Sequence, residues 1–353
     1  MSIRRRGKSW EIDYIDISGK RVRKSGFRTK VDAEIFLAEA KVNKSRGISN
    51  ILDKNLTIED ACIYFLNNYA GLHCKEKTFD EYKIIVYKII IPYFKGAKLA
   101  NLKKTDIEDF VKTYKDKGLK NATVNKYKTV LGSIIERQIE NGKIFQNVAK
   151  KVKPLKTQCN IARALNRAEI RILLDTCKKV KPDFYNMLFT LVHTGMRRGE
   201  MVALMWKNVD FSNNVINVRY SEYKGKLVTP KSATSYRSIK MPSVLRNVLL
   251  NQKLKTGDGK FVFPNALGGM YMANNVNRRM FKPVVRASNL GELRLHDIRH
   301  TYGSQLIENG AHIKYVQAQM GHASVNVTLN IYTHYYVESE DKALTILENL
   351  YTT

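Results

Sequence analysis

Four short motifs in the second half of this 353-residue chain contain side chains suited to phosphate chemistry. In the first, TGMRRGE, a glycine-containing turn leads into a predicted helix and places Arg197 near the helix N-terminus. A guanidinium can bind phosphate through two parallel hydrogen bonds, and the positive end of a helix favours the same anion. The motif alone is weak evidence, because an arginine in a first helical turn is usually a surface residue.

The next two motifs add a lysine, a histidine and a second arginine. Lys231 lies in TPKS, in the turn of a predicted hairpin whose far strand carries Arg237. In LHDIRH, His296 and Arg299 are three residues apart and therefore share one face of a helix. Taken singly, a surface lysine and an ordinary helical face explain both motifs.

The fourth motif supplies a nucleophile. Gly321-His322 is followed by a polar stretch, by Thr328 and then by Tyr332 in YTH. A tyrosine hydroxyl can form a covalent intermediate, but the chain has 19 tyrosines and most must be structural. A competing interpretation concerns His296 and His300, which are spaced like the histidines of an HExxH zinc helix. Asp297 replaces the glutamate of that motif, and no third ligand is evident.

The order and spacing of the motifs, TGxRxxE, a lysine hairpin, HxxRH and GHxxxxxTxxxYxH, resemble the tyrosine recombinase (phage integrase) family over about residues 164–336. Among the nearby lysines, Lys231 precedes a small polar run and then SYR, as the family pattern does. The resemblance implies that Glu200 is a supporting residue and that the catalytic residues are Arg197, Lys231, His296, Arg299, His322 and Tyr332.

The resemblance implies site-specific DNA recombination through a 3′-phosphotyrosyl intermediate, as in the integration and excision of a prophage or similar mobile element. Arg197, Arg299 and His322 would bind the phosphate oxygens, on which negative charge builds up during attack. Tyr332 would attack, His296 would help to accept its proton, and Lys231 would protonate the departing 5′ oxygen. The covalent link conserves the bond energy, so we expect no metal, nucleotide or other cofactor.

The composition independently predicts a polyanionic partner. The chain has 61 Lys and Arg against 32 Asp and Glu, a net charge of +29, and 44% hydrophobic residues. No apolar run approaches the roughly 18 residues of a membrane span, and the N-terminus lacks the apolar region of a signal peptide. The scattered cysteines Cys62, Cys74, Cys159 and Cys177 form no CxxC pair. These features predict a cytoplasmic, multidomain, nucleic-acid-binding protein without a membrane partner.

The first 45 residues are predicted to form a separate basic module. Trp10–Ile17 and Lys20–Phe27 have strand patterns, and Thr29–Lys44 has helical spacing. Residues 1–30 contain ten Lys and Arg against three acids. A basic sheet backed by a helix can lie in a DNA groove. By resemblance, this is the arm-site-binding module of lambda-type integrases.

Residues 57–150, after a polar linker over 46–56, are predicted to form a helical domain, which by resemblance is the core-binding (SAM-like) domain. Thr57, Thr78 and Thr105 each begin an [ST]xx[DE] pattern typical of a helix N-cap. A fourth helix is predicted over about 122–140.

A basic connector over 150–163 precedes a mixed α/β domain, 164–353, the tyrosine recombinase catalytic domain by resemblance. Asn166 is predicted to cap its first helix. Its predicted strands are Val215–Tyr220, Lys226–Thr229 and Tyr236–Met241. The overall fold class is therefore multidomain and mainly α, with small β-sheets.

The tail over residues 339–353 has one apolar face at helical spacing, so it must pack against its own domain or a neighbour. The resemblance favours a neighbouring protomer in a tetramer on DNA. It also implies core and arm attachment sites as partners, together with accessory proteins that bend DNA or set direction. A binding protein without chemistry and a type IB topoisomerase are the remaining alternatives. The full set of candidates argues against the first, and the N-terminal module and chain size argue against the second.

Overall fold

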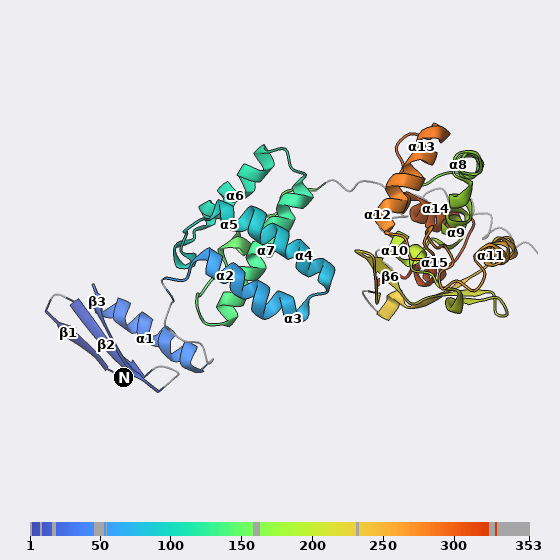
Figure 1. Cartoon of the computed structure of the whole chain (residues 1–353). Coiled ribbons are helices and arrows are strands. Elements are labelled where there is room, and N and C mark those ends of the chain that lie inside the picture. Colours follow the sequence, from blue (N-terminus) through green and yellow to red (C-terminus); the bar gives the residue numbers. More distant parts are fainter. Residues whose placement is uncertain are drawn as a thin grey trace, which may run out of the picture. The chain divides into compact units, whose positions relative to one another are not determined.

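The computed structural model describes residues 2–7, 9–15, 19–45, 53, 55–157, 163–230, 233–324 and 329. The chain divides into two compact units, residues 1–159 and 160–353, and each is described by itself (Figure 1). Helices predominate, and the strands form small antiparallel sheets, as the sequence predicts. None of the helices among the described residues is long and apolar enough to cross a membrane.

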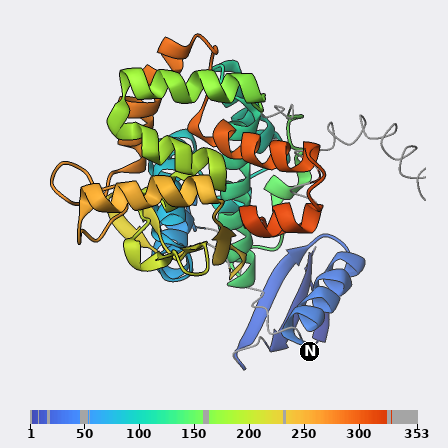
Figure 2. The same ribbon diagram turned by 90° about the vertical axis from the view of Figure 1, so that its right-hand side faces the viewer.

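The first unit begins with a three-stranded antiparallel sheet of order β1-β2-β3, covered on one face by a helix (Figures 1 and 2). Its elements are β1 (Ser2–Arg6), β2 (Ser9–Ile15), β3 (Arg21–Phe27) and α1 (Lys30–Ser45). Ile12 and Tyr14 of β2 pack on Leu37 of α1 in the core. The sequence analysis missed β1, because the strand has three consecutive arginines and no apolar alternation.

The opposite face of this sheet is charged. On the central strand, the buried carboxylate of Glu11 accepts hydrogen bonds from Arg4 (2.9 Å from Nε) and Arg6 (3.2 Å) of β1. The buried carboxylate of Asp13 accepts from Arg21 (2.9 Å) and Arg23 (3.3 Å) of β3. Two acids therefore hold four arginine side chains in place across the sheet.

The rest of the first unit is helical around one apolar core, which includes Phe65, Ile90, Phe110 and Ile134. Two of its helices contain a π-helical segment in the middle. The elements are α2 (Ile58–Phe65) with Leu66–Ala70 and α3 (Gly71–His73); α4 (Glu76–Ile85) with Val86–Ile90 and α5 (Ile91–Tyr93); α6 (Lys104–Asp116); α7 (Asn121–Glu140); and 3-10 turns Leu99–Asn101 and Val148–Lys151.

One of the three predicted N-caps in this part is correct. Thr57 caps α2, and its hydroxyl accepts a hydrogen bond from the backbone N–H of Asp60 (3.0 Å). The predictions for Thr78 and Thr105 are wrong. The helix α4 begins earlier, with the Lys75 carbonyl accepting from Thr78 N. The helix α6 begins at Lys104, because the Asp106 carboxylate accepts from Lys103 N (2.7 Å).

The second unit packs helices and short strands around a core that includes Leu188, Ile216, Leu245, Phe281 and Ile298. Its helices are α8 (Arg167–Val180), α9 (Pro182–Thr194), α10 (Arg198–Val202), α11 (Ser243–Thr256), α12 (Ala273–Val276), the π-helical Asn277–Phe281, α13 (Lys282–Ser288), α14 (Leu295–Glu308) and α15 (Ile313–Met320), with 3-10 turns Trp206–Asn208 and Ala233–Ser235. Its strands are β4 (Val209–Asp210), β5 (Val215–Val218), β6 (Ser221–Tyr223), β7 (Lys226–Val228) and β8 (Arg237–Lys240).

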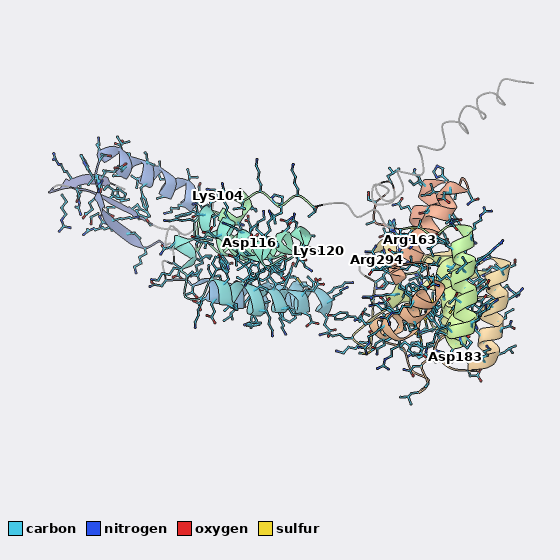
Figure 3. All side chains as sticks on the ribbon, turned by 90° about the horizontal axis from the view of Figure 1, so that it is seen from above. Lys104, Asp116, Lys120, Arg163, Asp183 and Arg294 are labelled. Carbon is cyan, nitrogen blue, oxygen red and sulfur yellow. The ribbon has the colours of Figure 1, made fainter. Side chains whose placement is uncertain are left out.

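Side chains fix the starts of two of these helices, and Figure 3 labels an arginine at each start, Arg163 and Arg294. Asn166 caps α8 as predicted, and its side-chain oxygen accepts from Glu169 N (2.9 Å). Arg163 pairs with Glu169 (2.7 Å). At the start of α14, Arg294 pairs with the buried carboxylate of Asp297 (2.7 Å).

The predicted strand pairing of the hairpin around Lys231 is wrong. The strand β7 pairs with β6 through a tight turn in which Lys224 and Gly225 both have positive φ, +51° and +76°. The strand with Arg237, β8, pairs instead with β5, in the sheet β4-β5-β8. Arg237 therefore lies opposite Val218 of β5 and not opposite β7. Lys231 itself lies outside the described residues.

Candidate active site

The turn before α10 depends on a glycine. Gly195 ends α9 in the left-handed conformation, with φ +57°. A Cβ atom at this position would lie 2.4 Å from Cδ1 of Tyr302. Glycine is therefore required both by the backbone conformation and by the tyrosine ring packed against it. The turn places Arg197 immediately before α10, as the sequence predicts.

Two side-chain contacts hold Arg197 in place. Its Nη1 donates to the buried Glu200 carboxylate (2.8 Å), and its Nη2 donates to the Gly321 carbonyl (3.0 Å). Glu200 also accepts from the backbone N–H of Arg197 (2.9 Å). The Arg197 side chain is 36% exposed, so a partly accessible guanidinium is held in a fixed orientation.

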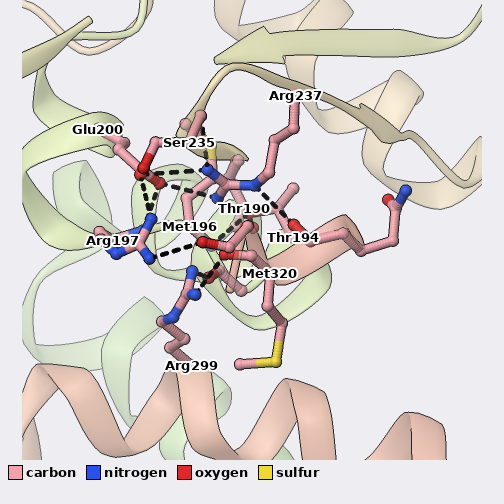
Figure 4. A network of polar contacts seen from close by, with 12 residues as sticks. Thr190, Thr194, Met196, Arg197, Glu200, Ser235, Arg237, Arg299 and Met320 are labelled. Carbon is pink, nitrogen blue, oxygen red and sulfur yellow. Dashed lines mark hydrogen bonds and ion pairs between the residues drawn. The ribbon is translucent and has the colours of Figure 1, made fainter. Parts of the chain in front are cut away.

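Arg299 approaches the same place from α14. The residue is 2% exposed, and its Nη1 donates to the Gly195 carbonyl (2.7 Å), while its Nη2 donates to the Met320 carbonyl. Arg299 therefore connects the turn before Arg197 to the end of α15. Figure 4 shows the two arginines beside each other, with the Glu200 carboxylate between Arg197 and the third arginine, Arg237.

His322 follows the end of α15, which Gly321 terminates with φ +65°. Its backbone N–H donates to the Gln317 carbonyl (3.2 Å), and its own carbonyl accepts from the Gln317 side chain (3.1 Å). Burial, together with the charges of Arg299 and Arg197, lowers the pKa of His322 to about 3. The imidazole is therefore neutral at physiological pH and can donate one hydrogen bond.

His296 lies one turn before Arg299 on α14, and its ring meets that of His300 edge to face, with centroids 4.7 Å apart. Loss of surrounding water, with the charges of His300, Arg299 and Arg197, lowers the pKa of His296 to about 4. A neutral imidazole can accept a proton. In the part of the chain that the structure describes, no group of three His, Cys, Asp or Glu could hold a metal ion.

The structure thus brings together Arg197, Glu200, Arg299 and His322 around the end of α15. Two other candidates, Lys231 and Tyr332, lie outside the described residues, as does the tail over residues 339–353. Sequence reasoning assigned no role to Arg237, which is buried against Glu200. In the sequence it was visible only as a charged residue on a predicted strand, at the end of the SYR run.

Family models match two parts of the chain. The model of the phage integrase family matches residues 163–339, and that of the SAM-like N-terminal domain of phage integrases matches residues 57–115. The first match contains every candidate catalytic residue.

The chain is similar to curated proteins along most of its length. It is 25% identical to a tyrosine recombinase XerC-like protein of Caldanaerobacter subterraneus, covering 95% of this chain and 94% of that protein. It is 26% identical to the ICEBs1 integrase of Bacillus subtilis, covering 78% of each.

Solved structures share the fold. The Tn1549 transposon integrase in complex with circular intermediate DNA matches with a TM-score of 0.73 and 22% identity, covering 84% of this chain and 99% of that one. The lambda integrase, solved as a tetramer on a Holliday junction, matches with a TM-score of 0.63 and 18% identity, covering 93% of each chain.

Proposed function

The chain belongs to the phage integrase family and is a tyrosine-type recombinase, and from this premise we propose how it cleaves and rejoins DNA. Double-stranded DNA is cut at attachment sites through a 3′-phosphotyrosyl intermediate, and the product is an integrated or excised mobile element. The observation that carries this proposal is the convergence of Arg197, Arg299 and His322 at one helix end. Trapping of a covalent adduct on a nicked duplex, made from the DNA flanking the gene, tests it.

The two arginines and His322 bind the scissile phosphate. Arg197 and Arg299 face the non-bridging oxygens, and the neutral His322 imidazole donates a further hydrogen bond. Negative charge builds up on these oxygens during the attack, so fixed cationic donors stabilise the transition state more than the ground state. Backbone carbonyls and Glu200 already hold the arginines in these orientations. The site therefore needs no reorganisation when DNA binds.

Tyr332, His296 and Lys231 carry out the nucleophilic attack and the proton transfers. The Tyr332 oxygen attacks the phosphorus, the new phosphorus–oxygen bond forms, and the bond to the 5′ oxygen breaks. His296 receives the tyrosine proton, and Lys231 supplies a proton to the departing 5′ oxygen. Rejoining is the same sequence in reverse, with a 5′ hydroxyl as the nucleophile. The phosphodiester that breaks is replaced by a phosphotyrosyl ester of similar energy, so rejoining needs no nucleotide or metal cofactor.

We assign three domains to this reaction: an arm-type DNA-binding module over 1–45, a core-binding domain over 57–150 and a catalytic domain over 164–353. Four protomers assemble on two duplexes, since recombination needs four strand cleavages, and the tail of each docks on its neighbour. Proteins that bend DNA or set direction complete the assembly. We place the reaction in the cytoplasm.

The arginine-lined face of the N-terminal sheet supports contact with arm-site DNA. Arg4, Arg6, Arg21 and Arg23 are held by the two central acids in positions from which guanidinium groups can reach phosphates or base edges. Ordered side chains lose less conformational entropy on binding than mobile ones do. This face is therefore the predicted contact surface of the module.

Deletion of residues 1–50 is expected to leave cleavage at the core site intact and to abolish recombination that needs arm sites. The slope of log affinity against log salt on arm DNA should fall, because fewer phosphates are neutralised. Gel-shift titrations at several salt concentrations measure both quantities. Replacing the four sheet arginines with alanine should reproduce the deletion, whereas Lys30→Ala with Lys41→Ala on α1 is the control. Unchanged affinity for every segment of attachment DNA after the deletion would contradict this assignment.

The cleavage rate is expected to stay level between pH 7.5 and 5.5. The lowered pKa values of His296 and His322, about 4 and about 3, keep both imidazoles neutral throughout that range. A histidine with the ordinary pKa of about 6.5 would instead lose roughly 90% of its neutral form by pH 5.5. The pH profile of kcat/KM reports the free enzyme and is the appropriate measurement, with DNA binding followed separately at each pH. A fall in the cleavage rate centred near pH 6.5 would show that the lowered pKa values of the two histidines do not govern the reaction.

A further inference from the structure

Three arginines converge on three consecutive carbonyls at the end of α15 (Figure 4). Arg237 donates through Nε to Gln319 O (2.6 Å), Arg299 donates to Met320 O, and Arg197 donates to Gly321 O (3.0 Å). The last carbonyls of a helix lack intrahelical partners and carry its partial negative charge. One helix end therefore receives guanidinium groups from β8, from α14 and from the residue before α10.

Arg237 is set apart from the other two because both of its Nη atoms bind the Glu200 carboxylate. Its side chain is 5% exposed, and its Nη atoms donate to both oxygens of Glu200 (3.1 and 2.8 Å), itself 3% exposed. A further hydrogen bond runs to the Ser235 carbonyl (3.3 Å). All three nitrogens of this guanidinium therefore donate to protein acceptors, and its charge is opposed by the Glu200 carboxylate.

Glu200 joins this buried arginine to the exposed one. Its Oε1 accepts from Nη1 of both Arg197 and Arg237, and its Oε2 accepts from the backbone N–H of Arg197 and from Nη2 of Arg237. Burial alone would raise the pKa of Glu200, but the hydrogen bonds and charge of Arg237, with the charge of Arg197, lower it. The carboxylate is therefore ionised and bridges two guanidinium groups.

The end of α15 is packed closely against Arg237. A Cβ atom on Gly321 would lie 3.0 Å from Arg237 Cδ and 3.0 Å from the Thr234 carbonyl. Gln319 adds a second connection to β8, because its side-chain oxygen accepts from Lys240 N (3.0 Å). His322 is the residue directly after Gly321, which ends the helix. Any shift of Arg237 would therefore displace His322 as well as Glu200.

We propose that Arg237 is a positioning residue that holds Arg197 and His322 as one unit. It acts on Arg197 through Glu200 and on His322 through the Gln319 carbonyl, and it does not touch DNA. This inference rests on the proposed function, since it concerns the orientation of the phosphate-binding groups. A misplacement of about 1 Å in such groups is enough to slow a reaction roughly 100-fold.

A purely structural role is the competing explanation, because a buried ion pair also has to satisfy its own charges. Such pairs can often be replaced by neutral side chains without loss of stability, whereas removal of one partner is destabilising. The two roles are separable, because a positioning role affects the cleavage rate of folded protein and a structural role affects the amount of folded protein.

The test compares Arg237→Lys with wild type in single-turnover cleavage of a nicked duplex made from the DNA flanking the gene, at saturating DNA concentration. Lysine keeps the charge but cannot span both Glu200 and the Gln319 carbonyl. We expect DNA affinity within about twofold of wild type and cleavage slower by roughly 10- to 100-fold. Lys240→Gln, an exposed cation on the same strand, is the matched control and should cleave normally. A wild-type cleavage rate in folded Arg237→Lys would overturn the proposal.

Two further variants distinguish the positioning role from a purely structural one. In an Arg197→Ala background, Arg237→Lys should slow cleavage by much less than it does alone, because it acts partly through Arg197. If the effects multiply in full, Arg237 does not act through Arg197.

Should the single variant unfold, Glu200→Gln with Arg237→Gln supplies a neutral pair, which should restore the melting temperature but not the cleavage rate. Wild-type cleavage by that double variant would overturn the positioning role. Absence of any adduct with the wild-type chain would instead contradict the proposed function.

Discussion

Replacement of Tyr332 with phenylalanine is expected to abolish covalent attachment to DNA while leaving DNA affinity unchanged. The substitution removes one oxygen atom, the proposed nucleophile, and leaves the aromatic ring unchanged. A nicked substrate traps the adduct, because the short cleaved strand diffuses away and cannot be rejoined. The amount of protein–DNA adduct that survives denaturation measures the effect, which should be a loss to background.

Neighbouring tyrosines provide the matched controls for this prediction. Tyr335→Phe and Tyr336→Phe make the same chemical change three and four residues away. Both variants should form the adduct at a rate close to that of wild type. If Tyr332→Phe still formed a stable adduct, or if one of the controls lost it, the nucleophile would be assigned wrongly.

Arg197→Ala and Arg299→Ala are each expected to slow cleavage by roughly 10² to 10³, as is typical of the loss of a fixed donor to a developing oxyanion. Single-turnover rates at saturating DNA measure this effect without a contribution from binding. Arg198→Ala is the control, because Arg198 is exposed and adjacent to Arg197. Loss of DNA affinity with an unchanged cleavage rate would indicate that the two arginines serve binding only.

The two arginine variants should differ in stability. Arg299 is buried and donates to the carbonyls of Gly195 and Met320, and each carbonyl left without a partner costs about 1–3 kcal/mol. Arg197 is partly exposed, so its loss should lower the melting temperature less. Measurement of the melting temperature beside the cleavage rate separates the catalytic effect from the structural one.

Local signals allowed much of the fold and site to be predicted from the sequence. Thr57 and Asn166 cap helices as expected, since their oxygens need only a backbone N–H a few residues away. The turn before Arg197 and the helix carrying Arg299 were also local patterns. The caps at Thr78 and Thr105 failed for the same local reason: a serine or threonine pattern occurs in a first helical turn as well as before it.

Long-range pairing explains what the sequence did not predict. The partner of β8 is β5, some 20 residues earlier, and no local pattern distinguishes it from the nearer β7. The position of Arg237 beside Glu200 follows from that pairing and from the packing of α15, which lies 80 residues further along the chain. β1 was missed because its strand character depends on arginine pairing with Glu11 rather than on apolar alternation.

Identification of the DNA-linked residue by mass spectrometry tests the central claim most directly. Trypsin cleavage of the trapped complex after Lys314 and Lys342 releases one peptide containing Tyr315, Tyr332, Tyr335 and Tyr336. Fragmentation of this peptide should locate a nucleotide on Tyr332, joined through the 3′ phosphate of the cleaved strand. A nucleotide on any other residue, or attachment through a 5′ phosphate, would contradict the account.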